Sequence, residues 1–411
     1  MRRILTWPWQ MTVLRILQLL VFLLFLVLLV NAVLNRGGDF VVYWRTGQNL
    51  LAGEPLYSVQ RDGGFCYKYP PWMALPLVPL GLFPLTTAAI FWRLLLVASL
   101  FQIWRWTTQM LKSQVPALLA LILLWGIWVQ NVVTGQMTLP LLAVALWAFE
   151  MSEKQPVLSA LATTQALAAK VFHVFAALGF SRKQFHPRPW AVAFGICLLA
   201  SIPALWGYRH SEGTFNLLTA PQNLLENYFA AMSSGDQKDL GGGLYGLPVL
   251  WAKWFGMDPI STRARLLGFV PSFLIAGLLL FILRFRWKGQ APRELYAVAL
   301  ALACAIHPLT FTYALAWLYP ALALSLQLLA YRPTEKRGGA RVARAIWIVG
   351  ALLLVFFNTK LSTRLGISLW EGYPVKAIGT LLICSSLGLI SPDFGTFESP
   401  SPGDPRARNT V

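Results

Sequence analysis

The stretch MTVLRILQLLVFLLFLVLLVNAVL, from Met11 to Leu34, decides the class of this 411-residue chain. It is apolar apart from a few residues such as Arg15 and Gln18, and a helix needs about 20 apolar residues to cross the hydrocarbon core of a bilayer. The run exceeds the ~7–15-residue apolar core of a secretory signal, and no small-residue cleavage site follows it. It therefore predicts a first transmembrane helix.

The composition of the whole chain extends this conclusion. Hydrophobic residues make up 57% and charged residues only 12%, whereas soluble domains carry about 25% charged residues. So few charges cannot solvate a globule of this size, which excludes a soluble multidomain protein. The net charge of +18 does not predict a nucleic-acid partner, because the Lys and Arg residues lie between apolar runs, as the positive-inside rule explains.

Further apolar runs predict an all-α polytopic membrane protein with about 10–12 transmembrane helices. The runs are 85–104, 114–132, 137–150, 156–169, 171–181, 189–206, 266–284, 294–306, 309–330, 343–358 and 373–391. The pair 156–169 and 171–181 is too short for two ordinary spans, so it is either one helix or two half-helices broken near Lys170. Broken helices at membrane depth require burial or a cavity. The proline-rich run 70–84 predicts a membrane-surface helix.

Charge predicts one membrane domain over residues 1–391 with a disordered cytoplasmic tail at 392–411. With both termini cytoplasmic, most basic clusters fall inside and the two long non-apolar segments, 35–69 and 207–265, fall outside. Two large loops on one face are typical of an enzyme working at that surface, more than of a transporter with a midplane site.

The first external segment carries the most suggestive carboxylate. It begins GGDFVVYW at residues 37–44, which places Asp39 just past the first predicted helix. Asp39 is either a helix-end or turn residue, or a general base that takes a proton from an acceptor hydroxyl. The glycines, aromatics and prolines that follow predict an ordered loop packed onto the membrane surface.

This segment resembles a known family. The strings GGDFVVYWRTGQNLLAGEPLYS (37–58) and FCYKYPPW (65–72) are similar to the start of glycosyltransferase family 87. Weaker similarities follow at Thr134-Gly135-Gln136-Met137, at Lys170 and at His307-Pro308-Leu309-Thr310-Phe311, so that the resemblance covers about residues 30–330. Val171-Phe172-His173 departs from the family, which often has a proline soon after the lysine.

The resemblance implies a GT-C fold in a bacterial inner membrane, with the active site facing the periplasm or cell exterior. The implied reaction moves a hexose, mannose being the best-known case, from a polyprenyl-phosphate donor to a lipid or glycan acceptor, with inversion and with Asp39 as the base. Membrane lipids are the other expected partners. The sequence contains no Asp-x-Asp motif, and we expect neither a metal nor a cofactor.

The charge of the leaving phosphate calls for nearby cations. The candidates are Lys170, His307, Arg45, Lys360 and Arg364, with His307 also suited to proton handling near pH 7. Each has an ordinary alternative. Lys170 can snorkel to the interface, His307 can bond backbone at a helix end, and Arg45 can pair with Asp39 or face water. Lys360 and Arg364 can lie in a solvated loop.

Gln136 is expected to bond either the sugar or a neighbouring helix. Two other functions stay open for the chain: a transporter or flippase of lipid-linked glycans, and a structural subunit of an envelope assembly. A flippase should line a central cavity with charges from several helices, whereas charges inside these runs are few, chiefly Arg15, Arg93 and Lys170.

Overall fold

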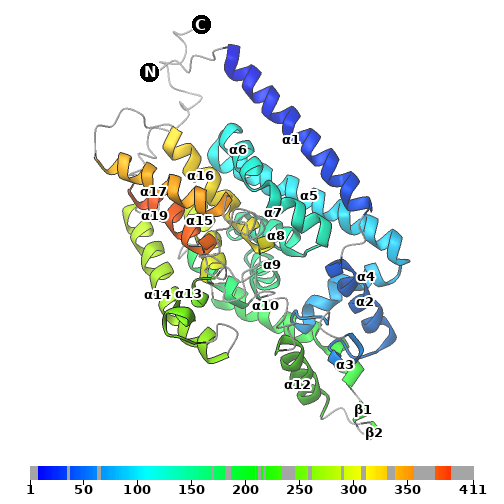
Figure 1. Cartoon of the computed structure of the whole chain (residues 1–411). Coiled ribbons are helices and arrows are strands. Elements are labelled where there is room, and N and C mark those ends of the chain that lie inside the picture. Colours follow the sequence, from blue (N-terminus) through cyan, green and yellow to red (C-terminus); the bar gives the residue numbers. More distant parts are fainter. Residues whose placement is uncertain are drawn as a thin grey trace.

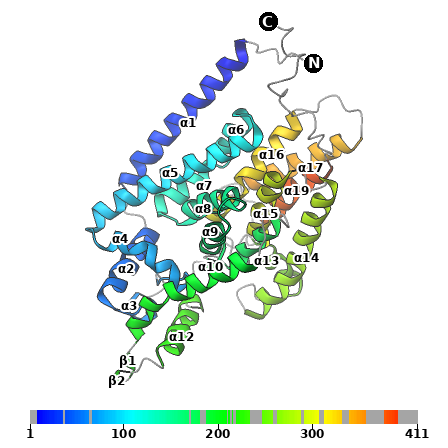
Figure 2. The ribbon, with the colours of Figure 1, turned by 180° about the vertical axis from the view of Figure 1, so that it is seen from behind.

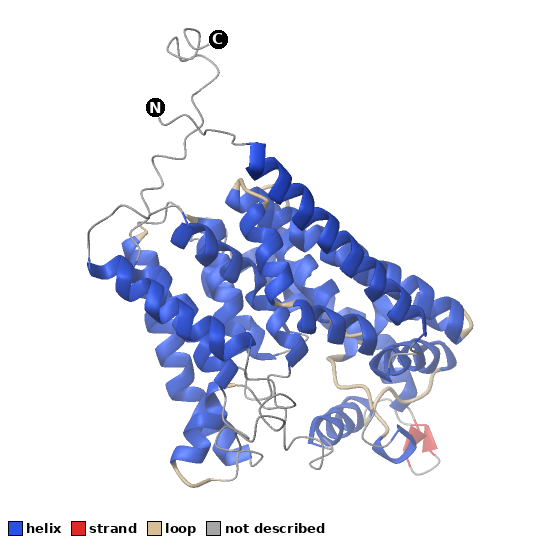
Figure 3. Ribbon diagram, turned by 45° about the horizontal axis from the view of Figure 1, so that its top comes forward, coloured by secondary structure: helices blue, strands red, loops and turns tan. Residues whose placement is uncertain are grey.

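The computed structural model describes most of the chain. The described residues are 8–34, 38–62, 66–168, 171–180, 187–208, 210–211, 214–215, 219–233, 246–257, 262–287, 291–306, 312–330, 338–355 and 375–389. This part is almost entirely helical, and a single short antiparallel pair of strands, β1 (His210–Ser211) and β2 (Thr214–Phe215), accompanies the helices (Figure 3). The predicted tail at 392–411 lies outside the described residues.

The helices follow the predicted apolar runs, and their bounds differ from the predictions by a few residues in most cases. They are α1 (Pro8–Leu34), α5 (Leu85–Leu111), α6 (Val115–Leu123), α7 (Trp125–Thr134), α8 (Thr138–Met151), α9 (Pro156–Ala168), η3 (Val171–Gly179), α10 (Pro187–Ala200), α11 (Ile202–Leu205), η4 (Trp206–Tyr208), α14 (Thr262–Arg286), α15 (Pro292–Ile306), η6 (Thr312–Leu318), α16 (Tyr319–Ala330), α17 (Gly338–Val355) and α19 (Val375–Leu389).

Several of these helices can cross a bilayer. Within the described residues, Leu85–Leu111, Pro187–Tyr208 and Leu267–Arg286 are long and apolar enough. The pair α6 and α7, bent by 64° at its junction, forms either a broken span or a re-entrant loop. Most of the other predicted runs form shorter apolar helices. The prediction of an all-α polytopic membrane protein is therefore confirmed, while the count of 10–12 spans stays a prediction.

The remaining elements gather at one end of the helix bundle. They are α2 (Gly38–Ala52), α3 (Val59–Asp62), η2 (Pro71–Leu77), α4 (Val78–Gly81), α12 (Ala220–Ser233) and α13 (Leu247–Trp254). In Figures 1 and 2, α2, α3, α4, α12 and the two strands lie together, at the end of the bundle opposite the start of α1. We call this the α2 end. The segments 35–69 and 207–265, predicted to share one side, thus both contribute to it.

Residues 38–52 correct one expectation, because they form the helix α2 and not a loop. The buried residues Phe40, Tyr43 and Gly47 recur at helical spacing and face the protein. Gly47 allows close packing on α4, where a β-carbon added at Gly81 would lie 2.6 Å from the backbone nitrogen of Gln48. The proline-rich run 70–84 is helical as predicted, although its prolines divide it into η2 and the single turn α4.

The pair α9 and η3 makes an excursion into the bundle and back. At its start, Ser159 Oγ donates to Ala148 O (2.7 Å), near the end of α8. At its close, Gly179 packs on α15, where an added β-carbon would meet that of Ala299 at 2.9 Å. α9 ends at Ala168 and η3 begins at Val171, and the two residues between them lie outside the described residues. The described residues thus form two separate helical segments, while Lys170 itself lies outside them and the break near it stays a prediction.

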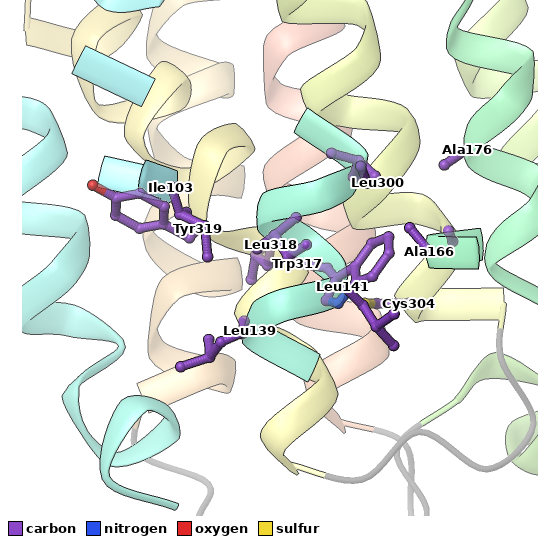
Figure 4. Close-up of a cluster of buried hydrophobic side chains, with 14 of the residues drawn as sticks. Ile103, Leu139, Leu141, Ala166, Ala176, Leu300, Cys304, Trp317, Leu318 and Tyr319 are labelled. Carbon is purple, nitrogen blue, oxygen red and sulfur yellow. The ribbon is translucent and has the colours of Figure 1, made fainter. Parts of the chain in front are cut away.

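The centre of the bundle is a dry apolar core. Leu141 of α8, Cys304 of α15 and Trp317 of η6 meet there (Figure 4), and each is at most 4% exposed. Ala166 of α9 lies near Cys304 in the same view. This core fixes the helices whose ends at the α2 end carry the candidate site.

Candidate functional site

A carboxylate and an amide, 97 residues apart in sequence, form the centre of the α2 end. Asp39 lies in the first turn of α2 and is half-buried. Gln136 lies in the turn between α7 and α8, is 4% exposed, and donates from Nε2 to the Asp39 carboxylate. The first turn of a helix favours a negative charge. The bond from Gln136 thereby orients the carboxylate at the start of α2.

The turn that carries Gln136 is fixed by Trp92 of α5. The indole Nε1 of Trp92 donates to Gly135 O (2.8 Å), and its ring lies 5.9 Å from the ring of Phe40 and 5.4 Å from that of Tyr43. Gly135 has φ +75°, and a β-carbon there would lie 2.8 Å from that of Phe40. Glycine at this position therefore lets the Gln136 turn approach the start of α2 closely.

Two tyrosine hydroxyls lie beside the carboxylate. Tyr43 Oη and Tyr69 Oη are 3.2 Å apart, and Tyr57 Oη donates to Tyr69 O (2.7 Å). Burial raises the pKa of Tyr69 to about 12; the bond from Tyr43 works against this rise and the charge of Asp39 adds to it. The hydroxyl of Tyr69 is therefore neutral at physiological pH.

A tyrosine cluster beneath this pair joins the two long segments. Tyr208 Oη accepts from the Tyr57 backbone nitrogen (2.7 Å), and the Tyr228 ring of α12 lies 5.2 Å from the ring of Tyr57. Tyr67 stacks on Tyr57 at 5.7 Å. Burial raises the pKa of both Tyr57 and Tyr67, so the cluster is neutral. It holds α12 and the residues around Tyr69 in one fixed arrangement.

Arg45 pairs with Asp62, whereas the sequence suggested Asp39 as its partner. It donates to Asp62 Oδ1 (3.0 Å), and Asp62, whose side chain is 4% exposed, also binds Arg61 at 2.9 Å. Arg61 in turn pairs with Glu54 at 3.1 Å. This network fastens α2 to α3, so Arg45 pairs with Asp62. Its role at the donor phosphate stays a prediction.

The other candidates, Lys170, His307, Lys360 and Arg364, lie outside the described residues, but helix ends locate the chain beside the first two. Arg293 binds Glu150 through both carboxylate oxygens (2.7 and 2.6 Å), so α15 runs antiparallel to α8 from the end opposite Asp39. Both helices are of similar length, which brings Ile306 level with the start of α8. α9 ends at Ala168, two residues before Lys170.

Sequence reasoning missed four of these residues: Tyr43, Tyr69, Trp92 and Asp62. The helical spacing of Phe40, Tyr43 and Gly47 was a signal for the buried face of α2. By contrast, no local pattern joins Trp92 to Gly135 or Arg45 to Asp62. Among the described residues no three His, Cys, Asp or Glu side chains gather to hold a metal, and the expectation that no metal is needed stays a prediction.

A comparison with protein families assigns the chain to one of them. The family model described as glycosyltransferase family 87 matches residues 67–312, which is 246 of the 411 residues. The chain belongs to glycosyltransferase family 87. This family-87 protein is therefore a membrane glycosyltransferase, and the flippase and scaffold alternatives lose their support. Neither the curated proteins nor the solved structures gave a match.

The matched range includes part of the site. Tyr69, Trp92 and Gln136 fall within residues 67–312, as do the positions of Lys170 and His307. Asp39 precedes the range and is joined to it by the bond from Gln136. The family-87 protein thus has a half-buried carboxylate that is held by the turn between α7 and α8.

Proposed function

We propose that this family-87 glycosyltransferase moves a hexose, with mannose the first candidate, from a polyprenyl-phosphate donor to a lipid or glycan acceptor. The bond between Gln136 and Asp39 carries the proposal, because it orients a carboxylate at the end of a membrane bundle. A lipid-linked donor and a membrane acceptor would both reach such a site from the bilayer.

The proposed step is a single displacement. The acceptor oxygen attacks the anomeric carbon and its proton passes to Asp39, while the bond from that carbon to the phosphate oxygen breaks. The polyprenyl phosphate leaves with the electron pair, and the configuration at carbon inverts. General-base catalysis of this kind contributes about 10²–10⁴-fold.

Cations would stabilise the leaving phosphate, and Lys170 and His307 remain the proposed ones. What supports them is the position of their neighbours: α9 and α15 both end toward the α2 end, at Ala168 and Ile306. Lys360 and Arg364 remain weaker proposals. Preorganised positive charge at a leaving group is usually the largest catalytic term.

We further propose that the α2 end faces the periplasm or cell exterior of a bacterial inner membrane, with both termini cytoplasmic. Arg284 and Arg286 lie in the last turn of α14, and Arg293 lies beside Glu150, at the opposite end of α8 from Gln136. Basic residues favour the cytoplasmic side, which supports this orientation.

The donor class is tested with purified enzyme in nanodiscs, using membrane lipids and glycans as the acceptor pool. Labelled polyprenyl-phosphate-mannose, -glucose and -arabinose are compared with GDP-mannose. We expect label transfer from a polyprenyl-phosphate hexose, with an inverted anomeric configuration by NMR. Transfer from GDP-mannose alone would contradict the proposal of a lipid-linked donor.

A further inference from the structure

Arg93 is a cation placed at an unusual position, on the membrane-spanning helix α5 directly after Trp92, which holds the turn that carries Gln136. It is half-buried and lies eight residues after Leu85, where α5 begins. That separation is about 12 Å along the helix, and a long arginine side chain can reach back toward headgroup level. A charged side chain within a span is costly and is by default a sign of function.

The residues next to Arg93 on α5 have two kinds of surroundings, the candidate site and the outer apolar surface of the helix. Trp92, the residue before Arg93, donates to Gly135 O and contacts the rings of Phe40 and Tyr43. Gly135 and Phe40 are the chain neighbours of Gln136 and Asp39. Other neighbours are apolar and exposed: Ile90 (54%), Phe91 (49%), Leu94 (55%) and Leu95 (46%). In a bilayer this apolar surface faces lipid. Arg93 thus lies at the border between lipid and the candidate site.

We propose that Arg93 binds the phosphate of the lipid-linked donor as this lipid approaches the site over α5. The ligand class is a single phosphate carried on a long apolar chain. The guanidinium has five N–H donors in a planar fork that matches phosphate oxygens, so it can bind phosphate while keeping a contact within the protein. The polyprenyl chain would lie along the exposed apolar residues of α5. This inference rests on the proposed lipid-phosphate donor.

The chain offers a matched control on the same helix. Arg105 is exposed and lies twelve residues further along α5, toward the opposite end of the bundle. The variants Arg93→Gln, Arg93→Lys and Arg105→Gln are compared in full-length protein. Their melting temperatures in detergent identify any variant that fails to fold.

Binding is measured by native mass spectrometry with three probes: polyprenyl phosphate, polyprenol without phosphate, and phosphatidylglycerol. Polyprenyl phosphate needs no turnover, so the result does not depend on Asp39. We expect Arg93→Gln to weaken its binding by about 10–100-fold, as loss of a charge-assisted bond implies. Arg93→Lys should weaken it less, and Arg105→Gln should bind as the wild type. Polyprenol binding should be equal in all variants.

Three outcomes would overturn the inference. They are unchanged binding of polyprenyl phosphate by Arg93→Gln, an equal loss of polyprenol, and a loss confined to phosphatidylglycerol, which would make Arg93 a site for a structural lipid. Wild-type protein that binds no polyprenyl phosphate would contradict the donor class itself. Wild-type binding and transfer with an unaffected Arg93→Gln variant would contradict the role of Arg93 alone.

Discussion

Replacing Gln136 with leucine tests whether this residue positions Asp39. The bond from Gln136 Nε2 to the carboxylate is charge-assisted, and Gln136 is 4% exposed, so water cannot readily replace it. Such a bond contributes about 1.5–3 kcal/mol, and about 1.4 kcal/mol corresponds to a factor of ten in rate. If the bond is needed to orient the base, Gln136→Leu should lower kcat by about 10–100-fold.

The assay is the initial rate of sugar transfer at varied donor and acceptor concentrations. A positioning role predicts a fall in kcat with KM nearly unchanged, whereas a sugar-binding role predicts a higher KM for one substrate. Gln130→Leu is the matched control, because Gln130 is half-buried on α7, before the turn. Gln136→Glu places a like charge beside Asp39 and should move the acid limb of the pH–rate profile to higher pH.

Transfer by Gln136→Leu within about twofold of the wild type would refute this reasoning, since a bond worth 1.5–3 kcal/mol cannot then orient the base. An equal fall in Gln130→Leu would also refute it, because the effect would then belong to α7 in general.

Three further predictions concern the framework of the site. Gly135→Ala should destabilise the protein by about 1–3 kcal/mol, because φ is +75° and the new β-carbon meets Phe40. The control Gly126→Ala, which has open space around it, should not destabilise the protein. The melting temperatures of the two variants test this prediction. Asp62→Asn should lower the free energy of unfolding by about 1–3 kcal/mol. The loss is modest because the bound arginine side chains are 34–40% exposed. A melting temperature equal to that of the wild type would contradict this prediction. Since the pKa of Tyr69 rises to about 12 from a usual value near 10, its neutral form stabilises the fold below pH 10 and this stabilisation is lost as pH rises to 12. Tyr69→Phe should therefore show a smaller fall in melting temperature over that pH range, and an unchanged fall would contradict the assignment.

The membrane helices could be predicted from the sequence because their information is local. A long apolar run such as 85–104 identifies α5 wherever the rest of the chain lies, although the helix continues to Leu111. The shortness of the runs 156–169 and 171–181 left one helix or two half-helices open, and the structure describes two segments, α9 and η3. In contrast, α2 was missed as a helix, because its 15 residues mix polar groups and glycines and become helical through packing on α4 and α5.

The candidate site could be predicted only in part. Asp39 was singled out by its position after a span and by the family resemblance. The bond from Gln136 joins residues 97 positions apart, and the partner of Arg45 depends on how α3 folds back on α2. Such contacts are set by tertiary packing, which no spacing along the chain encodes.

Sugar transfer should depend most directly on Asp39. Membranes carrying wild-type protein, Asp39→Asn or the control Glu153→Gln, at equal expression, are supplied with radiolabelled polyprenyl-phosphate-mannose. Glu153 is exposed just beyond α8, at the end opposite Asp39. We predict transfer by the wild type and by Glu153→Gln, and a loss of about 10²-fold or more in Asp39→Asn. Full transfer by Asp39→Asn would contradict the account.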